Sequence, residues 1–158
     1  SDREIIDALK SAQQRGVILR VLLDPNKDAF GREKNGIPNR PVAHELTQAG
    51  ITVRWCDTHG EQCHAKWLMR RGAGETTMLL GSTNFTRRNL HNLNLETSVV
   101  LKGPANAAPL RRGQSWFDEC WYNLYGRHYS VDYENYADER LWPRLLYRTM
   151  EATGLSTF

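Results

Sequence analysis

The sequence predicts an α/β domain in which a central mixed β-sheet is flanked by helices. The chain has 158 residues, of which 40% are hydrophobic and 25% are charged, so it can bury one core and does not have the composition of a disordered chain. A helical pattern at its start is followed directly by an almost wholly apolar strand pattern, an order typical of α/β folds. Alternating strand patterns in the middle and aromatic-rich helical patterns at the end complete the prediction.

The first third of the chain predicts two helix–strand pairs. Residues 2–15 place apolar side chains on one helical stripe that ends at a glycine, and residues 17–23 follow as a strand buried on both faces. A polar loop over residues 24–40 comes next, and loops of this length are often functional or mobile. A short helix over residues 41–49 and a strand over residues 51–55 form the second pair.

The remaining elements are a hairpin, a further strand and two helices. The hairpin joins a strand over residues 64–70 to one over residues 76–80 through a glycine-rich turn. Alternation continues over residues 93–101, and the two helices cover residues 108–125 and 135–150.

The C-terminal segment is rich in aromatic residues, since ten of the 15 aromatic side chains lie between Trp116 and Tyr147. We expect them to pack this segment onto the sheet, and a stacking or lipid-binding surface is the alternative. The prediction is therefore one domain over residues 1–158. Its sheet core covers residues 1–102, and its C-terminal helices and tail cover residues 103–158.

Charge and hydropathy restrict the classes of partner. No stretch approaches the roughly 20 apolar residues of a membrane span, so we expect a soluble domain that is cytoplasmic or reaches a membrane through other parts of a parent protein. The net charge is only +3. Residues 64–90, however, contain five cationic side chains and only one carboxylate. This excess of positive charge favours an anionic substrate. A basic surface that only contacts solvent would have the same composition. The cations are Lys66, Arg70, Arg71, Arg87 and Arg88, and the acid is Glu75.

The cysteines do not form a disulfide framework in the sequence. Cys56, Cys63 and Cys120 are odd in number, which favours a reducing compartment. Zinc is an alternative, because His59 and His64 lie among the first two cysteines. Structural zinc sites usually have a second ligand pair farther along the chain, and this cluster has none, so we expect a polar loop and no metal.

Six polar side chains lie at the ends of the predicted hairpin and of the strand after it. They are His64, Lys66, Ser82, Asn84, Asn94 and Glu96. Each pair is two residues apart and would share one face of a strand, so all six would converge at one end of one sheet. An imidazole can attack phosphorus or donate a proton, an ammonium and amides can hold phosphoryl oxygens, and a carboxylate can orient an imidazole. This set requires no metal or cofactor.

These residues carry a family resemblance. His64-Ala-Lys66, the Gly-Ser-Thr-Asn run at 81–84 and Asn94-Leu-Glu96 together resemble the HKD motif of the phospholipase D superfamily, and the likeness covers most of the chain. It implies a phospholipase D-like fold, and phosphodiester hydrolysis or phosphatidyl transfer of the cardiolipin-synthase type through a covalent phosphohistidine. It also implies that no metal or cofactor takes part.

The resemblance also implies a role for each residue. His64 would be the nucleophile or the general acid, and Glu96 would orient it. The phosphate would be bound by Lys66, Ser82, Asn84 and Asn94. The motif expects an aspartate five positions after the lysine, where this chain has Arg71. Either Glu75 substitutes for that acid or the site works without it.

The family builds its active site from two HKD motifs, whereas this chain has one. No other histidine is followed two positions later by a lysine, so the second motif comes from a homodimer mate or from another part of the parent protein. Because Ser1 opens directly on a helix, we expect the chain to be the C-terminal half of a two-motif protein, inactive when isolated.

The substrate class remains open between two phosphodiesters. The aromatic-rich C-terminal segment favours a phospholipid, with peripheral membrane contact, and the basic segment fits nucleic acid, as in an HKD-type endonuclease. A catalytically silent HKD-fold binding module is the remaining alternative, which the arginine at position 71 favours.

Overall fold

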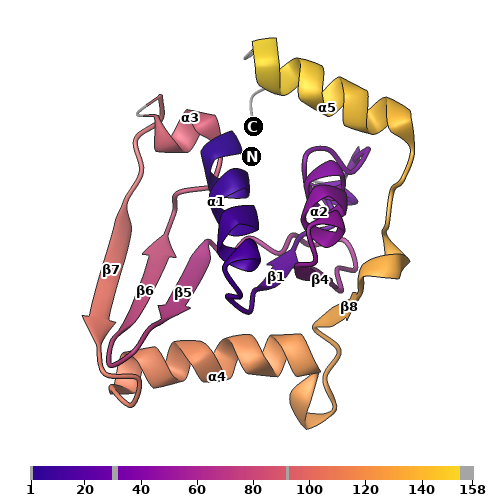
Figure 1. Ribbon diagram of the computed structural model, residues 1–158. Helices are drawn as coiled ribbons and strands as arrows, with labels where there is room; N and C mark the ends of the chain where they lie inside the picture. Colours follow the sequence, from indigo (N-terminus) through magenta and orange to yellow (C-terminus); the bar gives the residue numbers. More distant parts are fainter. Residues whose placement is uncertain (1, 30–31, 92, 154–158) are drawn as a thin grey trace.

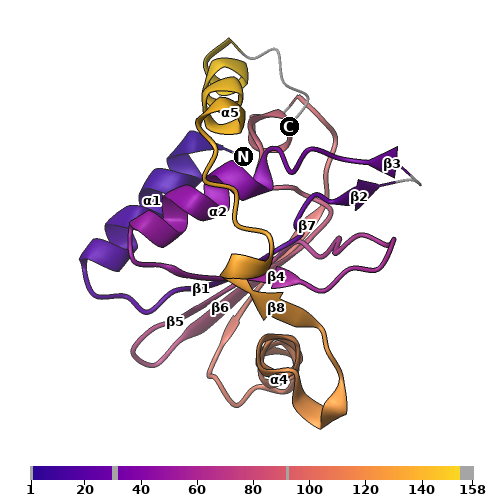
Figure 2. The same cartoon turned by 90° about the vertical axis from the view of Figure 1, so that its right-hand side faces the viewer.

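The computed structural model describes residues 2–29, 32–91 and 93–153. Its strands lie in a middle layer between helices (Figure 2), with α1 (Arg3–Gln14) and α2 (Asn39–Gln48) on one side and α4 (Ala108–Tyr122) on the other. The predicted α/β class is therefore confirmed. The strands form two separate three-stranded sheets and a two-stranded ribbon, whereas we had expected one central sheet.

The first sheet has the strand order β1-β4-β8. Strand β1 (Arg20–Leu23) runs parallel to β4 (Thr52–Cys56), and β8 (Ser130–Asp132) is antiparallel to β4. Helices α1 (Arg3–Gln14) and α2 (Asn39–Gln48) precede β1 and β4 and cover the same side of the sheet, as βα-type connectivity requires.

The main core lies between this sheet and helices α1 and α2. Its members are Ile6, Ile37, Val42, Ala43, Leu46, Ile51, Val53, Trp55 and Tyr147. Trp55 is fully buried, and its indole N–H donates to the carbonyl of Tyr133 at 2.7 Å. This bond provides the partner that a buried indole needs.

The second sheet is an antiparallel meander. It consists of β5 (Trp67–Arg71), β6 (Thr76–Gly81) and β7 (Ser98–Gly103), paired in that order. The predicted hairpin is thus confirmed.

Helix α4 (Ala108–Tyr122) joins the two sheets from below. Trp67 of β5 stacks on Phe117 with ring centroids 5.1 Å apart, and Phe117 stacks on Trp121. The guanidinium of Arg20, on β1, lies 5.0 Å from the centroid of the Phe117 ring. A Cβ at Gly113 would lie 2.4 Å from Met78 Sδ, so glycine is what lets α4 approach β6 this closely.

Further elements complete the chain, and Figure 1 labels α3 and α5 among them. The remaining elements are β2 (Asp28–Ala29), β3 (Arg32–Glu33), α3 (Arg87–Leu90), α5 (Leu141–Thr153) and two single-turn 3₁₀ helices at Leu124–Gly126 and Tyr133–Asn135. Among the described residues, no helix combines the length and apolar character needed to cross a membrane.

Several predicted strand boundaries are wrong, and the reasons are local. The strand predicted from residue 17 begins at Arg20, because the N–H of Val17 closes the end of α1 by donating to the carbonyl of Ala12. Ile18 is consequently 91% exposed and not buried. Strand β8 was not predicted at all. Residues 64–66 and 93–97 lie outside the strands to which we had assigned them.

Candidate active site

Three chain segments meet at one end of the β5-β6-β7 sheet. β5 begins at Trp67, β6 ends at Gly81 and β7 begins at Ser98. The ladders pair Trp67 with Leu80 and Gly81 with Ser98, so these three ends lie side by side. The segments meet as predicted, and Lys66, Ser82, Asn94 and Glu96 lie together at this end. These residues lie in the segments flanking the strands and not on the strands themselves.

The carboxylate of Glu96 is the centre of the hydrogen-bond network at this end. Ser82 Oγ donates to it at 2.5 Å, the side-chain amide of Asn94 donates at 2.6 Å, and Asn89 donates a further bond. The bonds from Ser82 and Asn94 hold the pKa of Glu96 below its usual value, although partial burial acts in the opposite direction. The carboxylate is therefore a stable negative charge that fixes three neighbours.

Gly81 allows the backbone after β6 to approach the backbone before β7. A Cβ at this position would lie 2.3 Å from the carbonyl oxygen of Thr97 and 2.6 Å from the Cα of Ser98. The N–H of Ser82 donates to that carbonyl at 2.9 Å, and Ser82 Oγ accepts from the N–H of Thr97 at 3.0 Å. The glycine of the Gly-Ser-Thr-Asn run is thus what places Ser82 against Glu96.

Lys66 brings a cation to the same place. The residue is half-buried, and its ammonium donates to the carbonyl of His64 at 2.8 Å. Burial lowers the pKa of Lys66, and the Glu96 carboxylate acts against that shift. A partly desolvated ammonium near a carboxylate has a strong field for a phosphoryl oxygen.

His64 and Asn84 are exposed. Among the described residues, neither side chain has a hydrogen-bond partner. The expected bond between Glu96 and His64 is not found in that part of the chain, because Ser82, Asn89 and Asn94 occupy the carboxylate. The imidazole and the amide are therefore free to bind a ligand.

The backbone before His64 is anchored from two sides. Cys56, at the end of β4, forms a disulfide with Cys63, and the N–H of Cys63 donates to Asp24 Oδ2 at 2.7 Å. The disulfide corrects our expectation that Cys56 and Cys63 are not paired. It also leaves no cysteine thiolate for zinc in this loop, and no cluster of three or more metal-binding side chains exists in the described residues.

The hairpin turn lies at the far end of the sheet from this site. Arg71 pairs with Thr76, about 13 Å along the strands from Trp67 at 3.3 Å per residue. Glu75, beside that turn, is too distant to replace the missing motif aspartate. The basic residues are divided in the same way, because Arg87 and Arg88 lie on α3, near the end of β6.

Sequence reasoning missed Asn89, which lies on α3 and bonds Glu96. Thr86 Oγ1 in turn donates to Asn89 Oδ1 at 2.5 Å. No spacing rule relates a residue on a one-turn helix to a carboxylate seven positions later, so the sequence held no signal for this contact.

Comparison with known proteins identifies the family. The family model described as "cardiolipin synthase, PLD-like domain" matches residues 1–121. No curated protein matches the chain. The matched range includes both three-stranded sheets except β8, together with the whole polar cluster around Glu96. The chain therefore belongs to the cardiolipin-synthase PLD-like domains of the phospholipase D superfamily, a family of phosphodiester hydrolysis and transfer.

Proposed function

We propose that this chain supplies one half of a two-histidine active site that hydrolyses or transfers the phosphodiester of a phospholipid. The observation that carries the proposal is the meeting of Lys66, Ser82 and Glu96, from three segments, at one end of one sheet. An exposed imidazole and an exposed amide, those of His64 and Asn84, lie in the same segments. This is a set of groups suited to a phosphoryl centre.

The proposed chemistry begins with His64 as nucleophile. An imidazole nitrogen attacks phosphorus, a P–N bond forms and the P–O bond to the leaving group breaks. The leaving oxygen takes a proton from the histidine of the second motif. Water or an alcohol then gives a proton to the histidine of the second motif and attacks the phosphohistidine, so that a P–O bond forms, the P–N bond breaks and the imidazole is released. If the second motif supplies the nucleophile, His64 takes the role of the acid.

The other residues would stabilise the charge that builds on phosphorus. Lys66 and Asn84 would bind the non-bridging oxygens, with Ser82 and Asn94 at the rim of the site. Because Glu96 already holds Ser82 and Asn94, we assign it the positioning of these two side chains and not the orientation of His64. Preorganised donors of this kind are a large part of catalytic power.

Phospholipid is favoured over nucleic acid as the substrate. The description of the matching family model names cardiolipin synthase, an enzyme that acts on lipids. The cations that favoured nucleic acid are divided between the two ends of the β5-β6-β7 sheet, so they offer no continuous track for a strand. The second histidine would come from a second copy of the chain or from another HKD segment.

The test begins with light scattering, which determines whether the chain is a dimer. A dimer is incubated with phosphatidylglycerol vesicles and with bis(4-nitrophenyl) phosphate, and is then examined by mass spectrometry for phosphorylated histidine. We expect turnover that His64→Ala abolishes and that His128→Ala, a change to another exposed histidine, leaves intact. A dimer that cleaves neither diester contradicts the proposal.

A monomeric chain is tested by the binding of inorganic tungstate, a mimic of the phosphoryl centre. We expect calorimetry to detect tungstate binding that Lys66→Ala weakens at least about tenfold, because one charge-assisted bond to the anion is lost. Absence of tungstate binding, or equal binding by the variant, would refute the half-site.

A further inference from the structure

Cys63, the residue before His64, is attached to two neighbouring strands of the first sheet. Its sulfur is bonded to Cys56 at the end of β4, and its N–H donates to Asp24 Oδ2 at 2.7 Å. Asp24 directly follows β1, which runs parallel to β4. Because the carboxyl ends of parallel strands lie at the same edge of a sheet, both attachments start from that edge. The backbone that carries His64 is thus tied to the core sheet at the preceding residue.

The carboxylate of Asp24 uses each of its oxygens for a different backbone N–H. Oδ1 accepts from Asn26 at 2.7 Å, and Oδ2 accepts from Cys63, also at 2.7 Å. The residue is half-buried, and in the described part of the chain it has no ion pair. Hydrogen bonds to an ionised acceptor are roughly twice as strong as neutral ones. An asparagine side chain has a single acceptor oxygen, so at this position it would keep only one of the two bonds.

The start of α2 holds Asp24 in place. Asn39, the first residue of α2, donates from its side-chain amide to the carbonyl of Asp24 at 2.8 Å and to Asn26 Oδ1 at 3.2 Å. Arg40 Nε donates to the carbonyl of Pro25 at 3.0 Å, and Pro25 is fully buried. The two ends of the polar loop between β1 and α2 are therefore cross-linked next to Asp24, so its carboxylate projects from a fixed backbone.

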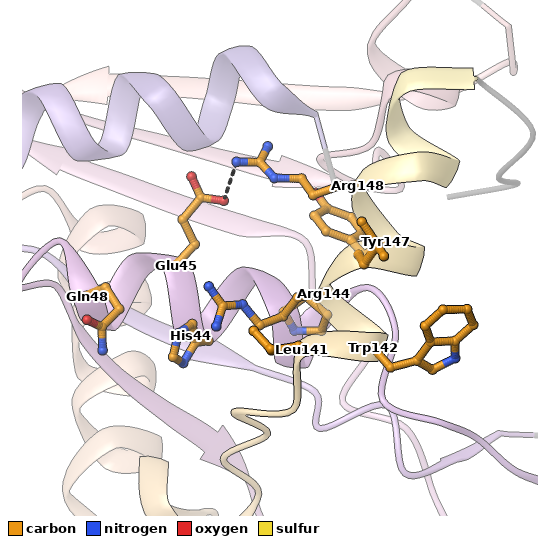
Figure 3. Close-up of a pocket in the computed structure, with 10 residues that line it drawn as sticks. His44, Glu45, Gln48, Leu141, Trp142, Arg144, Tyr147 and Arg148 are labelled. Carbon is orange, nitrogen blue, oxygen red and sulfur yellow. Dashed lines mark ion pairs between the residues drawn. The ribbon is translucent and has the colours of Figure 1, made fainter.

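Helix α2 is in turn held between its neighbours. Glu45 of α2 accepts from Arg3 Nη1 of α1 at 2.8 Å, and its carboxylate lies 3.7 Å from Arg148 Nη2 of α5. Figure 3 shows the pair with Arg148 as a dashed line beside the groove of about 640 Å³ that α2 and α5 line. Leu46, on the core side of α2, is buried. The helix that carries Asn39 is therefore fixed on several sides.

His64 lies between two fixed points of the backbone. Cys63 is the first point. The second is Lys66, whose carbonyl accepts from the N–H of Gly81 at 3.2 Å, directly before β5 begins. Only His64 and Ala65 separate these points, so the position of the imidazole depends on both of them. A displacement of about 1 Å in a reacting group can cost about 100-fold in rate.

The two attachments of Cys63 restrict different parts of the residue. The disulfide holds its side chain but leaves the preceding peptide plane free to turn. The hydrogen bond to Asp24 fixes that plane, because the N–H must point at Oδ2 to form it. The direction in which the chain enters His64 is therefore set by the carboxylate.

We propose that Asp24 is a positioning residue for His64. Its carboxylate holds the N–H of Cys63 and so places the imidazole for its reaction with the diester. The inference rests on the proposed function, since this placement affects a rate only if His64 attacks or protonates the diester. It also gives a role to the start of the polar loop after β1. Glu96 positions Ser82 and Asn94, and Asp24, from the other sheet, positions the segment that they face across the site.

The first measurement is amide hydrogen exchange in the parent chain, followed by NMR. The N–H of Cys63 has an acceptor, whereas that of Gln62 has none among the described residues. After correction for intrinsic rates, we expect Cys63 to exchange at least about tenfold more slowly than Gln62, because its proton is released only when the bond to Asp24 opens. Equal rates would overturn the inference without any variant.

The second measurement compares Asp24→Asn with the control Asn35→Ala. Asn35 is exposed, and its Oδ1 accepts from the N–H of Ile37 at 3.2 Å, the same two-residue spacing as the bond from Asn26 to Asp24. In a dimer that cleaves bis(4-nitrophenyl) phosphate, Asp24→Asn should lower kcat at least about tenfold and change KM less than about twofold, because the groups that bind the diester stay in place. It should also speed the exchange of Cys63 at least about tenfold. Asn35→Ala should change neither property.

In a monomeric chain, the shift of the His64 imidazole NMR signals on tungstate binding replaces the kinetic measurement. Asp24→Asn should reduce that shift and keep the tungstate affinity within about twofold of the parent, because Lys66 is unchanged. Should Asp24→Asn fail to fold, the comparison of Cys63 with Gln62 in the parent decides.

The outcomes separate this inference from the proposed function. A parent chain that neither cleaves the diester nor binds tungstate contradicts the proposed function. Faster Cys63 exchange in Asp24→Asn then still supports the placement of His64 by Asp24, and unchanged exchange overturns it. The inference is also overturned if Asp24→Asn keeps the kcat or the imidazole shift of the parent, or if Asn35→Ala shows the same loss.

Discussion

The middle strand of the first three-stranded sheet and the outer strand β7 of the second are buried to very different degrees. In the β1-β4-β8 sheet, Val53 and Trp55 of β4 are 4% and 0% exposed, because α1 and α2 cover them. In the β5-β6-β7 sheet, Val99 and Val100 of β7 are 50% and 54% exposed. The β1-β4-β8 sheet contributes most of the buried core, and the β5-β6-β7 sheet carries the candidate active site at one end.

This difference divides stability from function along the chain. Apolar burial, the largest favourable contribution to folding, is concentrated in the first sheet and its helices. The polar network around Glu96 is exposed or half-buried, so its hydrogen bonds add little to stability but fix the geometry of the site. Substitutions in the first sheet should therefore change stability and leave the geometry of the site unchanged. Substitutions around Glu96 should change activity and leave stability unchanged.

The largest expected effect is on stability. Trp55→Ala should lower the free energy of unfolding by about 4 kcal/mol, because it removes a fully buried indole and leaves a cavity. Urea unfolding measures this loss. Trp142→Ala is the matched control, since that side chain is 70% exposed, and its effect should stay within about 0.5 kcal/mol. Similar losses for both variants would show that the first sheet is not the main core.

The next effect belongs to the second sheet. Lys66→Ala should lower kcat/KM on a phosphodiester by about 100-fold or more in the assembled site, equivalent to about 3 kcal/mol, because a preorganised cation is lost from the transition state. The unfolding midpoint should not change. Lys102→Ala is the control on the same sheet, because Lys102 pairs with Thr77, toward the hairpin turn. Equal losses for the two variants would remove Lys66 from the site.

The disulfide links the two regions and gives the third effect. Replacing Cys56 and Cys63 by serine should lower the free energy of unfolding by about 2.5 kcal/mol, the chain-entropy value for a loop of this size. Activity should fall as well, since Cys63 precedes His64. Cys120→Ser, at the free cysteine, is the control for both measurements. A dithiol reductant should lower the stability of the parent to that of the double variant. The same reductant should leave the stability of the double variant unchanged.

The difference between the sheets also explains what the sequence could predict. Long periodic patterns gave α1, α4 and the β5–β6 hairpin, because each of these elements satisfies most of its contacts with near neighbours in the chain. The meeting of Lys66, Ser82 and Glu96 followed from the hairpin, since the ends of antiparallel neighbours coincide.

What the sequence did not predict depends on distant contacts. Strand β8 has three residues, too few to show alternation, and it forms only because it pairs with β4 some 76 positions earlier. The bond from Asn89 to Glu96 depends on how α3 turns after β6. The Cys56–Cys63 pair required the loop geometry between the two sheets, which the spacing alone does not define.

The smallest expected effect is a pH dependence confined to the first region. Burial alone would raise the pKa of Glu45, but hydrogen bonds from Lys10 and Arg3 lower it below its ordinary value of 4.5. At pH values near 4.5 and just below, the Glu45 carboxylate of the unfolded chain therefore binds more protons than that of the folded chain. The stabilisation is present in full above about pH 4.5 and is lost as the pH falls through the lower folded value.

Glu45→Gln should remove this part of the acid dependence. We expect urea unfolding to show about 1 kcal/mol less stability than the parent at pH 7, as for a partly exposed ion pair, and a smaller difference at pH 3, because the parent loses this stabilisation as the pH falls toward the lowered pKa of its carboxylate. Glu75→Gln, beside the exposed turn of the second sheet, should have the same free energy of unfolding as the parent at both pH values. If both variants lost the same stability at pH 7, the charge pairs of α1 and α2 would hold the fold no more than any surface carboxylate does, and the division between the two sheets would rest on apolar packing alone.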